Sequence, residues 1–252
     1  RAILFGYACH NTSLGNYQLN GDWAGFAQEE IETRHPGAVA LFVQGCGADI
    51  NPIPRYQGND PELSTYAVEL PRMYGKILGA AVDLALHDPG KPLTSSLNTA
   101  FRLIDLPFHN PPTRQELLRR LEEKGEANAS RRRHAQYMLS IIDRNGKLPD
   151  HYPYPVQVWQ FGKELSLIAL GGEVVVDYSL RLKAQHGWNN TWVAGYCNDV
   201  FAYIPSRRVL MEGGYEGGGA MIPYGQPGPF GSAVEELIVE QVDDLIQDTR
   251  NR

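Results

Sequence analysis

The chain has 252 residues, 42% of them hydrophobic, with a net charge of −6 and a pI near 5.7. This length and composition support one sizeable core. The acidic balance argues against a nucleic-acid-binding protein, which needs a basic stripe, and no run of residues is long and apolar enough to span a bilayer. Three scattered cysteines exclude a disulfide framework and a CxxC zinc site.

Apolar strands alternate with amphipathic helices along the chain. Asp22 stands at the start of one helix as the predicted N-cap, and Pro71 is expected to bend a later one. In chain order, we predict a strand at 2–9, a helix at 22–34, a strand at 39–43, a helix at 63–86, a strand at 97–108, two charged helices within 113–145, a strand pair at 155–161 and 165–170, a helix at 174–186, a strand at 191–197 and a helix at 232–248.

This alternation predicts an α/β fold with a mixed β-sheet flanked by helices and a helical excursion around 113–145. The strand pair argues against a purely parallel sheet. We find no linker that divides the chain, so residues 1–252 are predicted to form a single domain. The chain begins at Arg1 within a predicted strand, which suggests a fragment of a longer domain.

Three apolar runs end in residues that could bind a metal ion: His10, Glu173 and Tyr203. Ligands gather outside the carboxyl ends of strands in α/β folds, so these side chains could meet in one cleft. His and Glu suit Zn²⁺. Each also has a structural alternative: His10 as a satisfied structural histidine, Glu173 as a carboxylate at a helix N-terminus, and Tyr203 as a buried aromatic residue.

Two loops carry further candidates for chemistry. The glycine-rich stretch 213–219 lacks the signature of a phosphate loop, and it is either a flexible loop or a lid that brings Tyr215 over a substrate. The loop 45–52 follows a predicted strand and carries Cys46, Asp49 and Asn51. A nucleophilic role for Cys46 lacks an evident histidine base.

These motifs together resemble, in the same order, the neutral/alkaline non-lysosomal ceramidases, which are zinc-dependent amidases. The resemblance covers most of the chain outside 91–150. The segments that carry it are Cys9-His10-Asn11-Thr12, Asn20-Gly21-Asp22, Ala48-Asp49-Ile50-Asn51-Pro52-Ile53, Gly171-Gly172-Glu173, Asn198 to Tyr203, Tyr215-Glu216-Gly217 and Tyr224-Gly225.

The resemblance implies that His10, Glu173 and Tyr203 are three of four Zn²⁺ ligands. The fourth ligand and a catalytic histidine would lie in a His-x-His segment upstream of residue 1. Tyr215 matches a tyrosine that hydrogen-bonds the scissile carbonyl. Asp49 is predicted to orient a ligand, because a metal-bound histidine commonly donates its second nitrogen to a carboxylate or carbonyl.

The implied reaction is hydrolysis of the N-acyl amide of ceramide, or of a related lipid amide, by metal-activated water. Asn51 replaces the family's loop serine and cannot act as an alkoxide nucleophile, which puts ceramide itself in doubt. The resemblance further implies a secreted or periplasmic protein that meets its lipid at a membrane surface. Two alternatives stay open: a degenerate, non-catalytic domain, and a metal-independent hydrolase that uses Cys46 or Cys9.

Overall fold

The computed structural model describes residues 1–15, 18–56, 67–93 and 96–251. The chain forms two compact units, Arg1–Thr94 and Ser95–Arg252. Each unit has its own sheet and its own covering helices, and each is described by itself below. The prediction of one domain over 1–252 stays a prediction.

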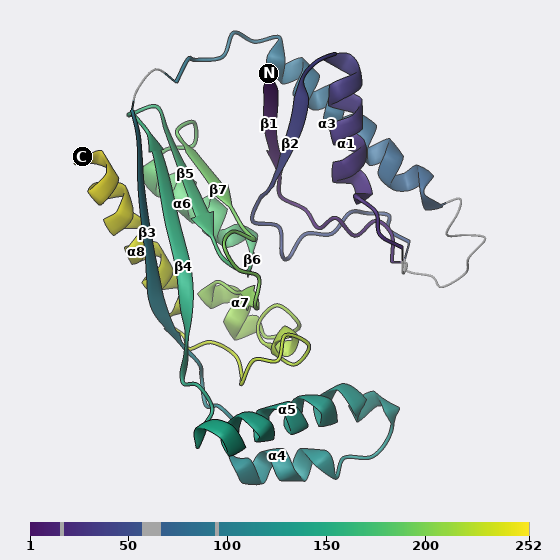
Figure 1. Cartoon of the computed structure of the whole chain (residues 1–252), viewed down its shortest axis with the longest axis vertical. Helices are drawn as coiled ribbons and strands as arrows, with labels where there is room; N and C mark the ends of the chain where they lie inside the picture. Colours follow the sequence, from purple (N-terminus) through teal and green to yellow (C-terminus); the bar gives the residue numbers. More distant parts are fainter. Residues whose placement is uncertain (16–17, 57–66, 94–95, 252) are drawn as a thin grey trace. The chain divides into compact units, whose positions relative to one another are not determined.

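The first unit is a parallel strand pair covered by two helices (Figure 1). Strands β1 (Ala2–Tyr7) and β2 (Val39–Gln44) pair in register from Ala2↔Val39 to Tyr7↔Gln44. Helices α1 (Asp22–Arg34) and α3 (Glu69–Leu86) pack on each other. The apolar core of this unit contains Ile3, Phe5, Ala27, Ile31, Ala38 and Ala40, with Phe42, Leu78 and Val82 against it.

The start of α1 differs from the prediction. Asp22 is the first residue of the helix rather than its N-cap, a position that Gly21 takes, and no side chain caps the helix. Asp22 has φ +47°, and its buried carboxylate accepts hydrogen bonds from the backbone of Leu14 at 3.1 Å and Trp23 at 2.8 Å. The carboxylate therefore ties the preceding loop to the helix start.

The predicted helix 63–86 is α3, and its residues 63–66 lie outside the described part. Pro71 falls in the first turn of α3, where a backbone N–H has no intrahelical partner in any case. The proline is therefore accommodated at a position where it removes no helical hydrogen bond.

The second unit is built on a four-stranded mixed sheet. Its strands are β3 (Leu97–Pro107), β4 (His151–Phe161), β5 (Leu165–Leu170) and β7 (Thr191–Ala194), in the order β3-β4-β5-β7. The first three are antiparallel neighbours, and β7 pairs parallel with β5. The predicted α/β fold with a mixed sheet flanked by helices is confirmed.

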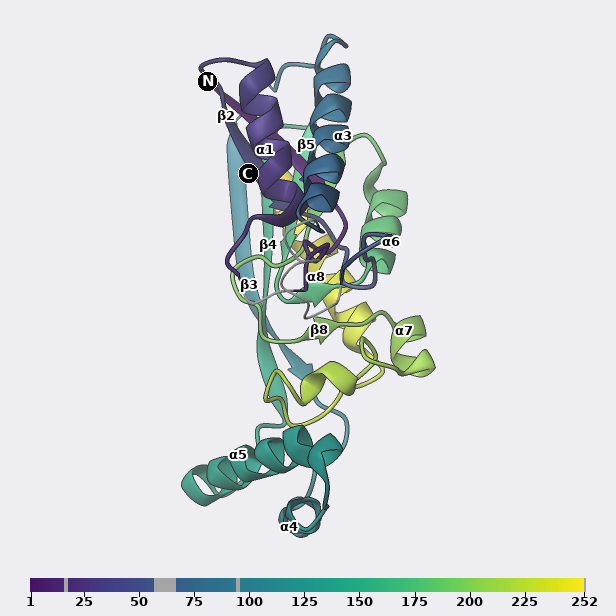
Figure 2. The ribbon, with the colours of Figure 1, turned by 90° about the vertical axis from the view of Figure 1, so that its right-hand side faces the viewer.

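Helices cover this sheet on one face and extend from one end of it. Helix α8 (Val234–Arg250) runs along β3 and β4, and α6 (Val176–His186) packs on β7 (Figure 1). The predicted helical excursion is a hairpin of α4 (Arg114–Leu121) and α5 (Ala129–Asn145) beyond the ends of β3 and β4 (Figure 2). A capping box of Thr113 and Glu116 begins α4.

Several short elements of the second unit were not predicted. Strand β6 (Glu173–Val174) pairs parallel with β8 (Tyr203–Ile204), and α7 (Arg207–Glu212) follows β8. The sequence placed Tyr203 at the end of the strand predicted at 191–197, which was wrong, because that strand ends at Ala194 and Tyr203 begins its own strand. The others are the 3₁₀ turns Glu126–Asn128 and Gly219–Met221.

Candidate functional site

The candidate site in the second unit is organised by a tight turn before Glu173. Gly172 has φ +72°, which favours glycine, and a Cβ there would lie 2.8 Å from the carbonyl oxygen of Ala202. This close approach lets the Glu173 amide donate to the same Ala202 oxygen at 2.9 Å. Gly172 therefore provides both the sharp turn and the close approach that place Glu173.

Glu173 is the centre of a group of tyrosines. It is 8% exposed and is the register partner of Tyr203 in the β6–β8 pair. One carboxylate oxygen, Oε2, accepts a hydrogen bond of 2.7 Å from the Tyr196 hydroxyl. The other, Oε1, accepts one from the Tyr224 hydroxyl. We call Glu173 with Tyr196, Tyr203 and Tyr224 the carboxylate–tyrosine cluster.

Burial and the charge of Glu173 keep these phenols protonated. Burial raises the pKa of Tyr196, Tyr203 and Tyr224, and the nearby negative charge of Glu173, together with hydrogen bonding to it, raises each pKa further. A protonated phenol can donate a hydrogen bond, whereas a phenolate beside a carboxylate would be repelled. The cluster is therefore a carboxylate held by neutral donors.

Tyr215 lies at the exposed edge of this cluster. Its ring makes an edge-to-face contact with Tyr203, with ring centroids 5.2 Å apart, and its side chain is half-exposed. Burial and the charges of Glu173 and Glu216 raise the pKa of Tyr215. Its hydroxyl is therefore a donor, as a role at a scissile carbonyl requires, and the lid function of its loop stays a prediction.

His10 belongs to the first unit, where its ring is oriented by the loop after β2. Its Nε2 donates a hydrogen bond of 2.8 Å to the carbonyl oxygen of Ala48. The residue's own carbonyl accepts from the Trp23 indole at 2.8 Å. The bond to Ala48 is of the kind that commonly fixes a metal-binding histidine. The acceptor of this hydrogen bond is the backbone carbonyl of Ala48, whereas the sequence suggested the side chain of the next residue, Asp49.

Asn51 lies in the same loop at the edge of an apolar cavity of about 440 Å³. Its Oδ1 accepts hydrogen bonds from Arg55 at 2.5 Å and from Thr12 at 3.4 Å. The side chain thus acts as a hydrogen-bond acceptor that joins two loop segments. This arrangement agrees with a positioning role rather than with a nucleophile.

The predicted site residues therefore form two groups. Glu173, Tyr203 and Tyr215 come together in the second unit, while His10, Asp49 and Asn51 lie on neighbouring loops of the first. That His10 joins Glu173 and Tyr203 at one metal ion stays a prediction from the resemblance.

The donor atoms of the second unit meet part of what a Zn²⁺ site needs. Glu173 and Tyr203 offer two oxygen donors from adjacent strands, and oxygen donors are accepted by Zn²⁺. A bound cation also favours the phenolate and so works against the raised pKa of Tyr203. In residues 1–15, 18–56, 67–93 and 96–251, no three His, Cys, Asp or Glu side chains form a metal-binding group. Glu173 and Tyr203 thus supply two of the four ligands that the resemblance implies.

Two members of the cluster were not assigned a role from the sequence. Tyr224 was noticed only as part of a Tyr-Gly motif, and Tyr196 was read as part of a strand. Tyr196 lies past the end of β7 with φ +59°, and its amide donates to the Gly172 carbonyl at 2.9 Å. The turn at Tyr196 and its pairing with Gly172 are visible only in the fold, so the sequence offered no local signal for this contact.

The cysteines are placed poorly for nucleophilic chemistry. Cys9 and Cys46 are buried. Burial and the charge of Asp22 raise the pKa of Cys9, and burial raises that of Cys197. A raised pKa lowers the fraction of reactive thiolate at neutral pH, which weakens the thiol alternative for Cys9.

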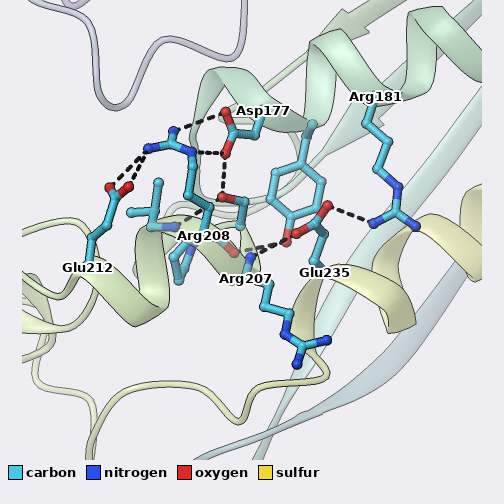
Figure 3. Close-up of polar contacts among 10 residues, drawn as sticks. Asp177, Arg181, Arg207, Arg208, Glu212 and Glu235 are labelled. Atoms are coloured by element: carbon cyan, nitrogen blue, oxygen red, sulfur yellow. Dashed lines mark hydrogen bonds and ion pairs between the residues drawn. The ribbon is translucent and has the colours of Figure 1, made fainter.

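A second polar group of the same unit joins α6, α7 and α8 (Figure 3). Asp177 accepts from Arg208 at 3.0 and 3.1 Å and from Ser206 at 2.5 Å. Arg181 pairs with Glu235 and Glu236, each at 2.6 Å. Arg208 also pairs with Glu212 at 2.9 Å, so each arginine is shared between two carboxylates. The group therefore joins helices through pairs of opposite charge. We call it the ion-pair network.

Comparisons of the chain with protein-family models, with curated proteins and with solved structures return no match. None of the described helices has the length and the apolar character needed to cross a bilayer.

Proposed function

We propose that this chain is a metal-dependent hydrolase of the ceramidase type, which cleaves the N-acyl amide of ceramide or of a related lipid amide. The observation that carries the proposal is the buried Glu173 carboxylate, paired in register with Tyr203 and held by Tyr196 and Tyr224. Glu173 and Tyr203 were expected to share a site, both because they end apolar runs and because the resemblance implies it.

Glu173 and Tyr203 would hold the Zn²⁺ ion, with His10 as the further ligand that the resemblance implies. When bound, Zn²⁺ supplies a Lewis acid and activates water for attack on a carbonyl. The tyrosines favour this role for Glu173 because a phenol donates a hydrogen bond without neutralising the carboxylate. The negative charge thus stays available to attract a cation.

The Tyr215 hydroxyl would donate a hydrogen bond to the carbonyl oxygen of the substrate amide as that oxygen gains negative charge. Its raised pKa keeps the proton in place at neutral pH, and its exposed position lets a substrate reach it. Removing one such donor typically lowers kcat by about 10²–10³-fold. Asn51 would orient the substrate through its amide, since it cannot be a nucleophile.

The proposal includes an exported protein, secreted or periplasmic, that contacts a membrane surface to reach its lipid. The alternative is a degenerate domain that has lost its catalytic activity. Metal content separates the two, because a degenerate domain should hold no stoichiometric Zn²⁺.

The test is elemental analysis of the purified protein with Glu173→Gln and Glu236→Gln beside it. We expect about one zinc per wild-type chain, its loss in Glu173→Gln, and its retention in Glu236→Gln. The control changes a carboxylate that pairs with Arg181 at the surface, so it reports on charge and stability alone. Zinc that survives in Glu173→Gln, or is missing from the wild type, would contradict the proposal.

The same preparations are then assayed for amide hydrolysis. A short-chain N-acyl sphingosine serves as the substrate, and Tyr215→Phe should keep its zinc but lose about 10²-fold or more in kcat. Tyr152→Phe is the matched control, because Tyr152 donates to Asp199 rather than to Glu173. Equal activity in the two variants would remove Tyr215 from the mechanism.

A further inference from the structure

The α4–α5 hairpin lies outside the segments on which the predicted resemblance rests, yet it contacts the segment that carries Tyr224. His134 on α5 is 5% exposed, and its Nε2 donates a hydrogen bond of 2.7 Å to the backbone carbonyl of Gln226. The ring of Tyr137, one helical turn later, packs on Gly225. A Cβ at Gly225 would lie 3.2 Å from that ring.

Gln226 connects this contact to the carboxylate–tyrosine cluster. Its side-chain amide donates to the carbonyl of Phe201 at 3.0 Å, two residues before Tyr203. Its backbone amide donates to Met221 at 2.9 Å and closes a turn around Tyr224. The segment 221–226 is therefore held by α5 on one side and by the residues just before β8 on the other.

We propose that His134 is a positioning residue for the cluster: through the Gln226 carbonyl it holds the Tyr224 hydroxyl on Glu173. The α4–α5 hairpin thereby becomes a part of the site although none of its residues belongs to the cluster. The proposal rests on the proposed function for its consequence on metal binding, but its structural content stands on the contacts above.

The chemistry of His134 agrees with this role. Burial lowers the pKa of His134, which favours the neutral imidazole, and a neutral imidazole has one N–H to donate. That N–H is committed to Gln226, while the buried Nδ1 has no hydrogen-bond partner among the described residues. A buried nitrogen without a partner is unfavourable. An apolar side chain would avoid this cost but could not donate to Gln226.

The test compares His134→Leu, which removes the donor, with His134→Gln, whose amide can replace it. The first readout is titration of tyrosinate absorbance in the metal-free protein, and the difference from Tyr224→Phe isolates Tyr224. In the wild type, Tyr224 should ionise above the usual pKa of about 10. We expect His134→Leu to shift it toward that value and His134→Gln to restore most of the shift.

A double-mutant cycle separates positioning from general loss of stability. His134→Leu should lower zinc affinity about 10-fold, which is the lower end of the effect of losing a residue that orients a metal ligand. In the Tyr224→Phe background the same substitution should have no further effect on zinc affinity. The matched control is Thr113→Ala, which removes the cap of α4 and leaves the His134 donor in place. This control should lower stability without moving the Tyr224 titration.

The outcomes are distinguishable. A folded His134→Leu protein with an unchanged Tyr224 titration overturns the inference, and so does a Thr113→Ala protein whose titration moves as far. If the Tyr224 titration moves as expected but the wild type binds no zinc, the proposed function fails and the positioning role stands.

Discussion

Glu173 and Asp177 are two carboxylates four residues apart that are held by different kinds of hydrogen-bond donor. Glu173 accepts hydrogen bonds from the hydroxyls of Tyr196 and Tyr224, whereas Asp177 is held by the guanidinium of Arg208 and the hydroxyl of Ser206. Both sit at the start of the β6–α6 segment, so the difference lies in what the rest of the second unit brings to them.

The difference concerns charge rather than hydrogen bonding. Both groups satisfy their oxygens, but an arginine also balances the negative charge, and a phenol does not. A carboxylate that is buried and held by phenols keeps its attraction for a cation, and this attraction is stronger where water is excluded. The ion-pair network is therefore suited to joining helices, and the carboxylate–tyrosine cluster to binding a cation.

The largest expected effect comes from breaking the turn that places Glu173. Gly172→Ala forces a left-handed backbone at φ +72° and puts a Cβ 2.8 Å from the Ala202 oxygen and the Ile204 side chain. We expect a loss of about 2–4 kcal/mol in unfolding free energy, measured by urea denaturation. Zinc should be lost as well, while the ion-pair network survives.

The control for this variant is Gly146→Ala at the end of α5. Gly146 has φ +81°, but a Cβ there meets nothing within 4 Å. It should cost only the backbone term, about 1–2 kcal/mol, and keep the zinc. If the two alanines cost the same, the close approach at Gly172 has no energetic role.

The α/β architecture could be predicted from the sequence because the spacing of apolar residues shows which segments are strands and which are helices. The strands of the mixed sheet and the two charged helices follow from the periodicity of apolar and charged residues. The short pair β6–β8 was missed because two-residue strands have no periodicity, and so Tyr203 was assigned to the wrong strand. Its nearness to Glu173 was nonetheless expected, because the resemblance placed both at one metal.

The tyrosines around Glu173 show where sequence reasoning ends. Tyr196 and Tyr224 lie 28 residues apart, and each reads as an ordinary aromatic in its own segment. Only the turn at Gly172 and the packing of 221–226 against α5 bring both hydroxyls to one carboxylate. Long-range contacts of this kind leave no local pattern, whereas His134 and Gln226 become informative once the fold is known.

Alkaline pH gives the next effect, which tests the tyrosines of the cluster. Burial and the charge of Glu173 raise the pKa values of Tyr196, Tyr203 and Tyr224 in the folded chain. Above about pH 10 the unfolded chain releases phenol protons that the folded chain retains. The unfolding free energy should therefore fall as pH rises, by about 1.4 kcal/mol per pH unit for each retained proton.

Urea unfolding between about pH 8 and pH 11 measures this fall. Glu173→Gln leaves the burial of the phenols but removes the charge that raises their pKa values further, so its stability should fall less steeply above about pH 10. Tyr152 is unaffected by that change, because its raised pKa comes from burial and Asp199. Parallel curves for wild type and Glu173→Gln would show that Glu173 does not govern the phenols.

The smallest effect is expected from Asp177→Asn in the ion-pair network. Burial alone would raise the pKa of Asp177, but hydrogen bonds from Arg208 and Ser206 outweigh it and lower the pKa. The carboxylate therefore stabilises the fold above the unfolded pKa of about 4, and this contribution is lost as pH falls. The amide of the variant keeps an acceptor for Ser206, so we expect a loss of about 1 kcal/mol at neutral pH that fades in acid.

Zinc content decides what this last variant says about the two carboxylates. Asp177→Asn should bind zinc as the wild type does, since Asp177 already has a cationic partner in Arg208, which it shares with Glu212. Comparing the zinc content of Asp177→Asn with that of Glu173→Gln shows whether zinc binding depends on the side chains around a carboxylate or only on a carboxylate being present in this segment. Loss of zinc from both variants would mean that the segment as a whole, rather than the tyrosines around Glu173, determines metal binding.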